Sequence, residues 1–287
     1  MSPPLPDPAI ADLPVTPPAP KTDPAPASAD PAASTPPAST PFAIRLRPVT
    51  MADPLRWLRR GWQDLLRCPG IGLFYGICFV AMGWVLRVLF EHAPVYMLGM
   101  SAGFLLVGPL MCLGMYQASR RLEAGQQPDL GESLLAWAPK AGTMGIFGVV
   151  LLVLEMLWAR SSLVVFAVTF DGMPDFKGSI LALFDPENIS FIVAYIAVGG
   201  LFAGLIFSVS VVAIPMILDR PDTDAISAAL TSIRLVLTQP ATMLLWGAII
   251  TTLVVLAMLP GFLGLLVVGP LLGHASWHAY RGTVEPD

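Results

Sequence analysis

Two histidines near the end of the chain have the spacing that most suggests chemistry. His274 and His278 stand four positions apart in an apolar stretch, so on a helix their imidazoles share a face. Such a pair can supply two ligands to a metal ion or a haem. A metal site needs further ligands, and the surrounding motif contains no cysteine or carboxylate. We therefore expect interfacial hydrogen bonding from this pair, with metal or haem binding as the alternative.

One acidic residue lies clearly inside an apolar segment. Glu155 stands in the segment Ala141–Ala159, five residues before Arg160. An ionised carboxylate inside a bilayer costs at least roughly 3 kcal/mol unless it is paired, so such residues are candidates for function. Arg160, or Arg87 from another segment, can neutralise it, and the alternative is a proton-coupled site. The next segment, Ser161–Phe170, extends the span, lies on the membrane surface or re-enters the membrane, which leaves the depth of Glu155 open.

Three prolines interrupt apolar segments. Pro109, Pro215 and Pro270 each remove a backbone hydrogen bond from a helix, which kinks the helix or exposes carbonyl groups to a cavity. Pro109 and Pro270 also occupy equivalent positions of an internal repeat. A symmetric pair of kinks is the best argument in the sequence for a solute pathway. The chain contains no hydrolase, zinc-protease, phosphate-loop or dinucleotide motif, so we expect neither enzymatic activity nor a cofactor.

The composition places the chain in a membrane. Of its 287 residues 55% are apolar and 13% are charged, and its mean hydropathy is +0.71. Soluble domains have about 25% charged residues, so we expect an all-α, polytopic membrane protein that contacts lipid and no nucleic acid. A helix of about 20 apolar residues crosses the hydrocarbon core. Six segments meet or approach this length, namely Gly70–Phe90, Val95–Ala118, Ala141–Ala159, Ile192–Leu218, Ala241–Leu259 and Gly261–Tyr280.

The apolar segments carry an internal repeat. Residues 53–76 and 224–247 are identical at 5 of 24 aligned positions, and residues 103–120 and 264–281 at 8 of 18. Identity at roughly one position in fifteen or fewer is the chance level for such compositions. The sequence therefore predicts six transmembrane helices that include two copies of a two-span unit. Because each copy has an even number of spans, the two repeats are parallel rather than inverted.

Basic residues predict the orientation of the chain and an interfacial helix. Lys and Arg concentrate before the first span and in alternate loops, which places both termini in the cytoplasm. An amphipathic helix precedes each repeated pair of spans. In the first of these helices the basic residues meet anionic lipid headgroups and the tryptophans enter the interface. The residues expected at this lipid interface are Arg56, Arg59, Arg60, Trp62 and Arg67.

The chain divides into a tail and a membrane domain. Residues 1–41 contain fourteen of the 29 prolines and no apolar run, so we expect a disordered Pro/Ala-rich cytoplasmic tail. The six-span membrane domain follows over residues 45–282. It consists of a first repeat at residues 53–120, a middle pair at residues 129–220 and a second repeat at residues 224–281.

Two stretches of the membrane domain resemble a known family. The run Ser208–Arg220 and the ending Val268–Arg281, with the pattern Gly-His-Ala-Ser-Trp-His-Ala-Tyr-Arg at Gly273–Arg281, are similar to the bacterial membrane family called domain of unknown function 2189. The similarity covers about residues 45–282 and excludes the tail. The resemblance implies a six-span protein of the bacterial inner (plasma) membrane. It implies no established activity.

Functions of different classes remain open. One is a non-catalytic scaffold or assembly factor with a membrane-protein partner, which the surface helices and the proline-rich tail favour. The alternative is a channel or transporter for a small solute, which the Pro109 and Pro270 pair and Glu155 favour. Transport predicts a polar cavity that reaches the bilayer midplane, whereas scaffolding predicts packed spans whose open grooves face lipid or a partner. Metal or haem binding by His274 and His278 is a third, weaker hypothesis.

Overall fold

Helices make up most of the chain that the computed structural model describes, which comprises residues 44–92, 97–169 and 189–285. The predicted tail lies outside these ranges. All described residues belong to one unit, residues 38–287. In chain order the helices are α1 (Asp53–Arg67), α2 (Pro69–His92), α3 (Met97–Glu123), α4 (Leu130–Leu134), the 3-10 helix η2 (Ala138–Lys140), α5 (Ala141–Thr169), α6 (Ile189–Ser210), α7 (Ala213–Asp219), α8 (Ala225–Thr238), α9 (Pro240–Met258) and α10 (Leu265–Thr283).

Four segments among the described residues are long and apolar enough to cross a membrane. They are Pro69–Leu89, Leu130–Val168, Ile189–Asp219 and Pro240–Met258, at the first, third, fourth and fifth predicted spans. Helices also occupy the second and sixth positions, as α3 and α10, but neither is among the four. The second half of α10 carries histidines and an arginine, and only part of the side chains of α3 is described. The all-helical membrane fold is therefore confirmed, and the count of six spans stays a prediction.

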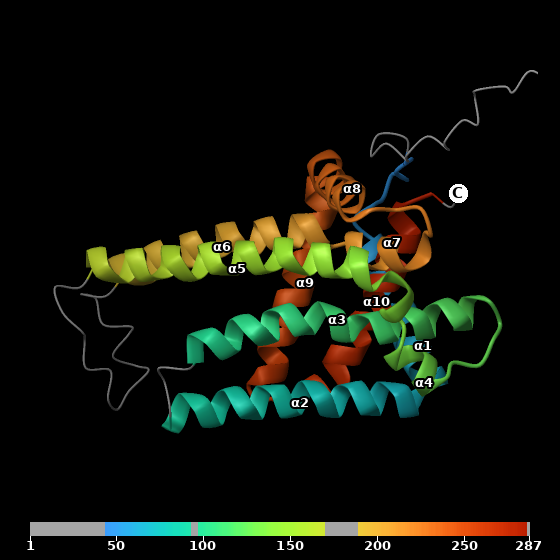
Figure 1. Ribbon diagram of the computed structural model, residues 1–287, viewed down its shortest axis with the longest axis horizontal. Helices are drawn as coiled ribbons and strands as arrows, with labels where there is room; N and C mark the ends of the chain where they lie inside the picture. The colour runs from blue at the N-terminus through green and yellow to red at the C-terminus, as the bar shows by residue number, and fades with distance from the viewer. Residues whose placement is uncertain (1–43, 93–96, 170–188, 286–287) are drawn as a thin grey trace, which may run out of the picture. The chain divides into compact units, whose positions relative to one another are not determined.

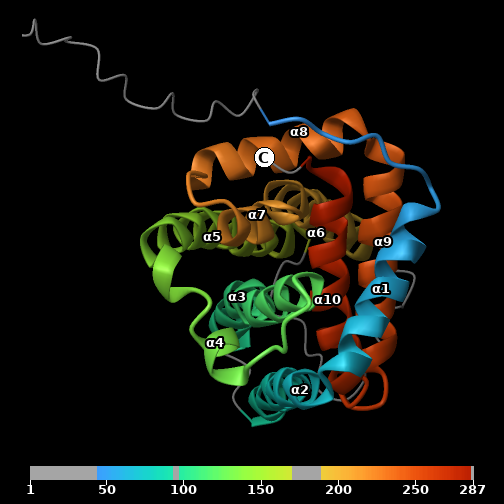
Figure 2. The same cartoon turned by 90° about the vertical axis from the view of Figure 1, so that its right-hand side faces the viewer.

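The long helices lie along two directions. Figure 1 shows α2, α3, α5 and α6 along one common direction, and Figure 2 views the same four helices end-on. The hairpin of α9 and α10 runs across this direction, from the side of α5 and α6 to the side of α2 and α3. Its turn uses left-handed backbone at Gly261 and Phe262, with φ values of 64° and 68°. The equivalent span pairs of the two predicted repeats, α2–α3 and α9–α10, therefore run in different directions. The parallel repeat also stays a prediction.

The first helix packs along the last one. The α1 backbone approaches α10 closely at Gly61, where an added Cβ would lie 2.6 Å from the backbone nitrogen of Ala275. One turn earlier Trp57 is buried and meets the ring of Trp246 edge-on, with centroids 5.6 Å apart. These contacts bury the α1 face that contains Trp57, Gly61 and Asp64. The opposite face, which contains Trp62, stays exposed.

Two predicted spans differ in length from the helices that form them. α5 continues to Thr169, so residues 161–169 of the ambiguous segment extend the third span, while Phe170 lies outside the described residues. The fourth predicted span is broken after Ser210 into α6 and α7. Pro215 stands in the first turn of α7, where its missing N–H leaves no donor for the carbonyl of Val211. The break agrees with the kink that the sequence predicts at this proline.

The two ends of the described chain pair with each other. Leu46 and Val284 form an isolated antiparallel bridge. On either side of it Arg47 N–H donates to Thr283 O over 2.8 Å, and Glu285 N–H donates to the carbonyl of Arg45 over 3.0 Å. The segment before α1 and the segment after α10 therefore lie side by side, joined by backbone hydrogen bonds.

Candidate functional site

Four buried polar side chains from three helices meet inside the protein. Asp64 comes from α1, Ser119 from α3, and His274 and His278 from α10. No more than 5% of any of these residues is exposed. The nitrogen Nε2 of His278 lies 2.7 Å from Asp64 Oδ2. The hydroxyl of Ser119 lies 2.8 Å from the same carboxylate oxygen and 2.8 Å from His274 Nδ1. These four residues form the polar cluster.

The hydrogen bonds of the polar cluster determine where its protons lie. Ser119 has one hydroxyl hydrogen, which it donates to Asp64 Oδ2. His274 must then donate from Nδ1–H to Ser119 Oγ, so its Nε2 is left as an acceptor. The Cys68 sulfur lies 3.9 Å from this Nε2, and the thiol donates to the backbone carbonyl of Asp64 over 3.1 Å. The cluster is a directed chain of hydrogen bonds from His274 to the Asp64 carboxylate.

Asp64 carries the negative charge of the polar cluster. Burial raises the pKa of its carboxyl, but the hydrogen bonds from His278 and Ser119 outweigh burial, so the pKa of Asp64 lies below the ordinary 3.8. The pKa of the neighbouring Cys68 thiol moves the other way, because burial and the Asp64 charge raise it to about 11. The site therefore holds a carboxylate beside a neutral thiol at neutral pH.

Further ion pairs surround the polar cluster on the side of His278. Its Nδ1 lies 3.6 Å from Glu123 Oε1, and Glu123 in turn pairs with Arg281 at 3.2 Å. Arg281 also lies 3.4 Å from Asp219, which accepts a hydrogen bond of 2.8 Å from the Tyr280 hydroxyl. His278 thus stands between two carboxylates, one from α3 and one from α1. Together these contacts tie α10 to three other helices, α1, α3 and α7.

The structure brings the two predicted histidines together but uses them in hydrogen bonds. Both face the interior from α10, and Asp64 and Cys68 add the carboxylate and thiol that the histidine motif lacks. Each histidine has a ring nitrogen bound to a protein oxygen. Within residues 44–92, 97–169 and 189–285, no three His, Cys, Asp or Glu side chains are grouped to hold a metal ion. The arrangement is one that fastens helices together.

Glu155 belongs to a helix that is longer than the predicted span. It stands at the middle of α5, about 21 Å from either end at about 1.5 Å per residue, and is 4% exposed. Its carboxylate makes no hydrogen bond or ion pair with the described residues. Arg160 is exposed, and Arg87 pairs with Glu91 at 2.9 Å, as their spacing predicts. Glu155 lines a mostly apolar cavity of about 360 Å³ between α5 and α6.

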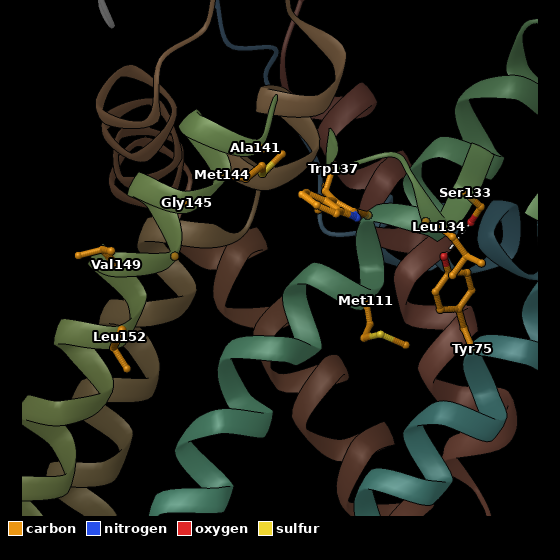
Figure 3. A pocket seen from close by; sticks show the side chains of 13 residues that line it. Tyr75, Met111, Ser133, Leu134, Trp137, Ala141, Met144, Gly145, Val149 and Leu152 are labelled. Atoms are coloured by element: carbon orange, nitrogen blue, oxygen red, sulfur yellow. Dashed lines mark hydrogen bonds between the residues drawn. The ribbon is translucent and has the colours of Figure 1, made fainter. Parts of the chain in front are cut away.

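A larger apolar groove lies between α3 and α5. It has a volume of about 550 Å³, and Figure 3 shows Met111 of α3 across from Val149 and Leu152 of α5, with Trp137 near one end. At the side, the hydroxyls of Tyr75 and Ser133 hydrogen-bond to each other over 2.9 Å, so one of their two hydroxyl hydrogens is already used. We call it the α3–α5 groove. The residues that line it are Tyr75, Met111, Leu113, Gly114, Ser133, Leu134, Trp137, Ala141, Met144, Gly145, Gly148, Val149 and Leu152.

The other predicted residues lie apart from these cavities. Pro215 and Pro270 are buried in α7 and α10, and neither lines the α3–α5 groove or the cavity at Glu155. Pro109 is part of α3, but its side chain lies outside the described part of that helix. The residues predicted for the lipid interface are all exposed on α1, and they are Arg56, Arg59, Arg60, Trp62 and Arg67.

Sequence reasoning missed the residues that complete the polar cluster. Asp64 belongs to the helix predicted at the lipid interface and was assigned no role there, and Ser119 was assigned none in the second span. The sequence did contain a pattern that could have found Asp64. Trp57, Gly61 and Asp64 are four and three residues apart, so an aromatic ring, a residue without a side chain and a carboxylate share one face of α1. That pattern is typical of a helix that packs closely on a partner. Nothing in the sequence identified α10 as the partner.

The fold defines a multi-pass, all-helical integral membrane protein. Residues 96–219 match the sequence model of the family described as "Predicted integral membrane protein (DUF2189)", so the resemblance predicted from the sequence is confirmed over this part of the chain. The match contains most of the run at residues 208–220 and ends before the histidine motif of α10. No curated protein and no solved structure matches the chain.

Proposed function

We propose that the protein is a non-catalytic scaffold or assembly factor of the bacterial inner membrane. The observation that carries this proposal is the α3–α5 groove, which is apolar and open rather than polar and enclosed. Four of its lining side chains, Leu134, Trp137, Val149 and Leu152, are between 39% and 59% exposed. A pathway for a solute needs polar groups along its walls, whereas an apolar groove suits the apolar surface of a protein partner or of lipid.

The polar cluster supports the same proposal. Its four buried side chains are bonded to one another and do not line the α3–α5 groove. Buried polar groups that hydrogen-bond from one helix to another hold those helices in one arrangement, as a docking surface requires. The six-span topology, the parallel repeats and the cytoplasmic termini belong to this proposal. The bridge between Leu46 and Val284 supports an even number of spans, because chain ends that pair lie on the same side of a bilayer.

The scaffold proposal is tested by asking what leaves the membrane with the protein. The full chain is extracted in mild detergent and its native mass spectrum is recorded. We expect a stoichiometric protein partner that is lost in Trp137→Ala, because Trp137 is 51% exposed at the groove. The matched control is Val168→Ala, at an exposed position near the far end of α5, which should retain the partner. A chain that carries only lipid in every sample contradicts the proposal.

A channel or transporter for a small solute is the second candidate, and Glu155 is the observation that favours it. A carboxyl group in the middle of a membrane helix, beside a cavity and without a described partner, has the placement of a proton-coupling residue. The test is proton flux into liposomes that contain the purified protein. A proton flux that disappears in Glu155→Gln while the protein stays folded would support transport. Equal proton flux in liposomes with wild type, with Glu155→Gln and without protein would exclude this candidate.

A further inference from the structure

The chemistry and the length of the α3–α5 groove identify a ligand class. Apart from the paired hydroxyls of Tyr75 and Ser133, its side chains are apolar. On α5 the lining runs from Ala141 to Leu152, which is about 17 Å along a helix. This length is close to half of the hydrocarbon thickness of about 30 Å. The groove therefore spans about one leaflet and has the polarity of that leaflet.

The end of the groove at η2 carries the features of a headgroup region. Trp137, at this end, is a residue type enriched at the membrane–water interface. Lys140 lies in the chain directly before the lining residue Ala141, and its ammonium group donates to the carbonyl of Pro221. One hydrogen bond leaves two of the three ammonium donors of Lys140 for a further acceptor. Lys140 does not itself line the groove, but its positive charge belongs to the residue directly before the lining residue Ala141, at the end where a phosphate would lie.

Glycines make room for a ligand on the α5 side. At Gly145 and Gly148 an added Cβ would meet no atom within 4 Å, although both residues line the groove. Glycine is costly inside a helix, by about 1 kcal/mol relative to alanine. Where helices pack closely, as at Gly61, glycine is needed because a side chain would clash with the neighbouring helix. Gly145 and Gly148 contact no neighbour, so their effect is to widen the groove.

We propose that the α3–α5 groove binds an acyl chain of a phospholipid from the leaflet next to η2, with the lipid phosphate near Lys140. The inference goes beyond the scaffold role. An acyl chain between α3 and α5 leaves Trp137, which is 51% exposed at the end of the groove, for contact with a protein partner, so each proposal can fail without the other. A bound lipid fills the gap between α3 and α5 in the membrane, so these two helices contact each other through the lipid. A partner helix in the same groove is the competing occupant, and the experiment below separates the two.

The experiment uses the full chain in bilayers of phosphatidylethanolamine and phosphatidylglycerol that contain a phospholipid with a photoreactive diazirine in one acyl chain. After illumination, labelled residues are mapped by mass spectrometry. We expect labelling concentrated at Met111, Met144 and Leu152. Gly148→Leu, which fills the groove and favours the helix, should lower this labelling about tenfold or more. The control Gly200→Leu, on α6 and also open around its Cβ, should label like wild type.

Three results would overturn the lipid site. One is equal labelling in Gly148→Leu and wild type when both show the same thermal unfolding. Another is labelling of the exposed α5 residues Val153 and Met156 as strong as that of the groove residues, which would indicate ordinary bilayer contact. The last is a protein partner displaced by Gly148→Leu with no specific lipid label, which would retain the scaffold and assign the groove to that partner. A native mass spectrum with one fewer retained lipid in Gly148→Leu would support the site independently.

Discussion

At the scale of single residues, Asp64 determines how the polar cluster behaves. Its carboxylate accepts hydrogen bonds from two helices at once, through Ser119 of α3 and His278 of α10. A buried charge of this kind is stable only while its partners remain, because an unpaired buried charge is strongly destabilising. The cluster is therefore the part of the molecule in which one side chain holds three helices together.

Removal of the Asp64 charge should destabilise the fold. In Asp64→Asn the shape is kept, but the hydrogen bonds from Ser119 and His278 no longer end on a charged acceptor, so we expect the free energy of unfolding to fall by about 2 kcal/mol. Denaturant titration in mild detergent measures this change. The matched control is Glu91→Gln, which breaks the exposed pair with Arg87 and should cost less than about 1 kcal/mol. Equal losses in the two variants would show that the Asp64 pair is not the stabilising contact.

The same carboxylate predicts how stability depends on pH. Because the pKa of Asp64 is lower in the folded protein than its ordinary 3.8, the unfolded chain binds this proton more readily. The contribution of Asp64 is complete above that ordinary value and is lost as the pH falls through the folded-state pKa. The thermal unfolding midpoint, measured from about pH 6 down to pH 3, should fall more steeply with decreasing pH for wild type than for Asp64→Asn. Parallel curves would contradict the assignment.

At the scale of helices, the sequence predicted which segments are helical better than how they pair. Apolar length placed the first, third, fourth and fifth spans, because a helix in lipid must satisfy its own backbone. Hydropathy could not show that α5 continues to Thr169, since its last turns are as apolar as a re-entrant segment would be. The position of Glu155 along its helix depends on that boundary. With the helix ending at Thr169 rather than at Ala159, Glu155 stands at the middle of the helix instead of near its end.

The central position of Glu155 gives a prediction about stability. A buried polar group without a hydrogen-bond partner costs about 1–3 kcal/mol, and no described residue bonds to this carboxyl. Glu155→Leu should therefore raise the thermal unfolding midpoint in lipid nanodiscs. Met156→Leu, at the exposed neighbouring position, is the control and should leave the midpoint near the wild-type value. A lower midpoint for Glu155→Leu would mean that the carboxyl group makes a stabilising contact.

At the scale of the whole molecule, the contacts that build the polar cluster join the two ends of the membrane domain. Asp64 and His278 are 214 positions apart, and Ser119 and His274 are 155 apart. Local periodicity carries no information on such pairings, which explains why the histidines were found in the sequence and their partners were not. The groove could not be predicted for the same reason, because nearly all of its lining residues come from α2, α3, α4 and α5.

The paired chain ends make the topology directly testable. The bridge between Leu46 and Val284 holds both ends of the described chain together, and arginines dominate the segment before α2. By the positive-inside rule both ends should then be cytoplasmic. A fluorescent protein that matures only in the cytoplasm should be bright when fused after Asp287, and an alkaline phosphatase active only in the periplasm should be inactive there. The same pair of reporters fused before Met1 should give the same result. Opposite results at the two ends would require an odd number of spans, which is incompatible with a chain whose ends pair across Leu46 and Val284.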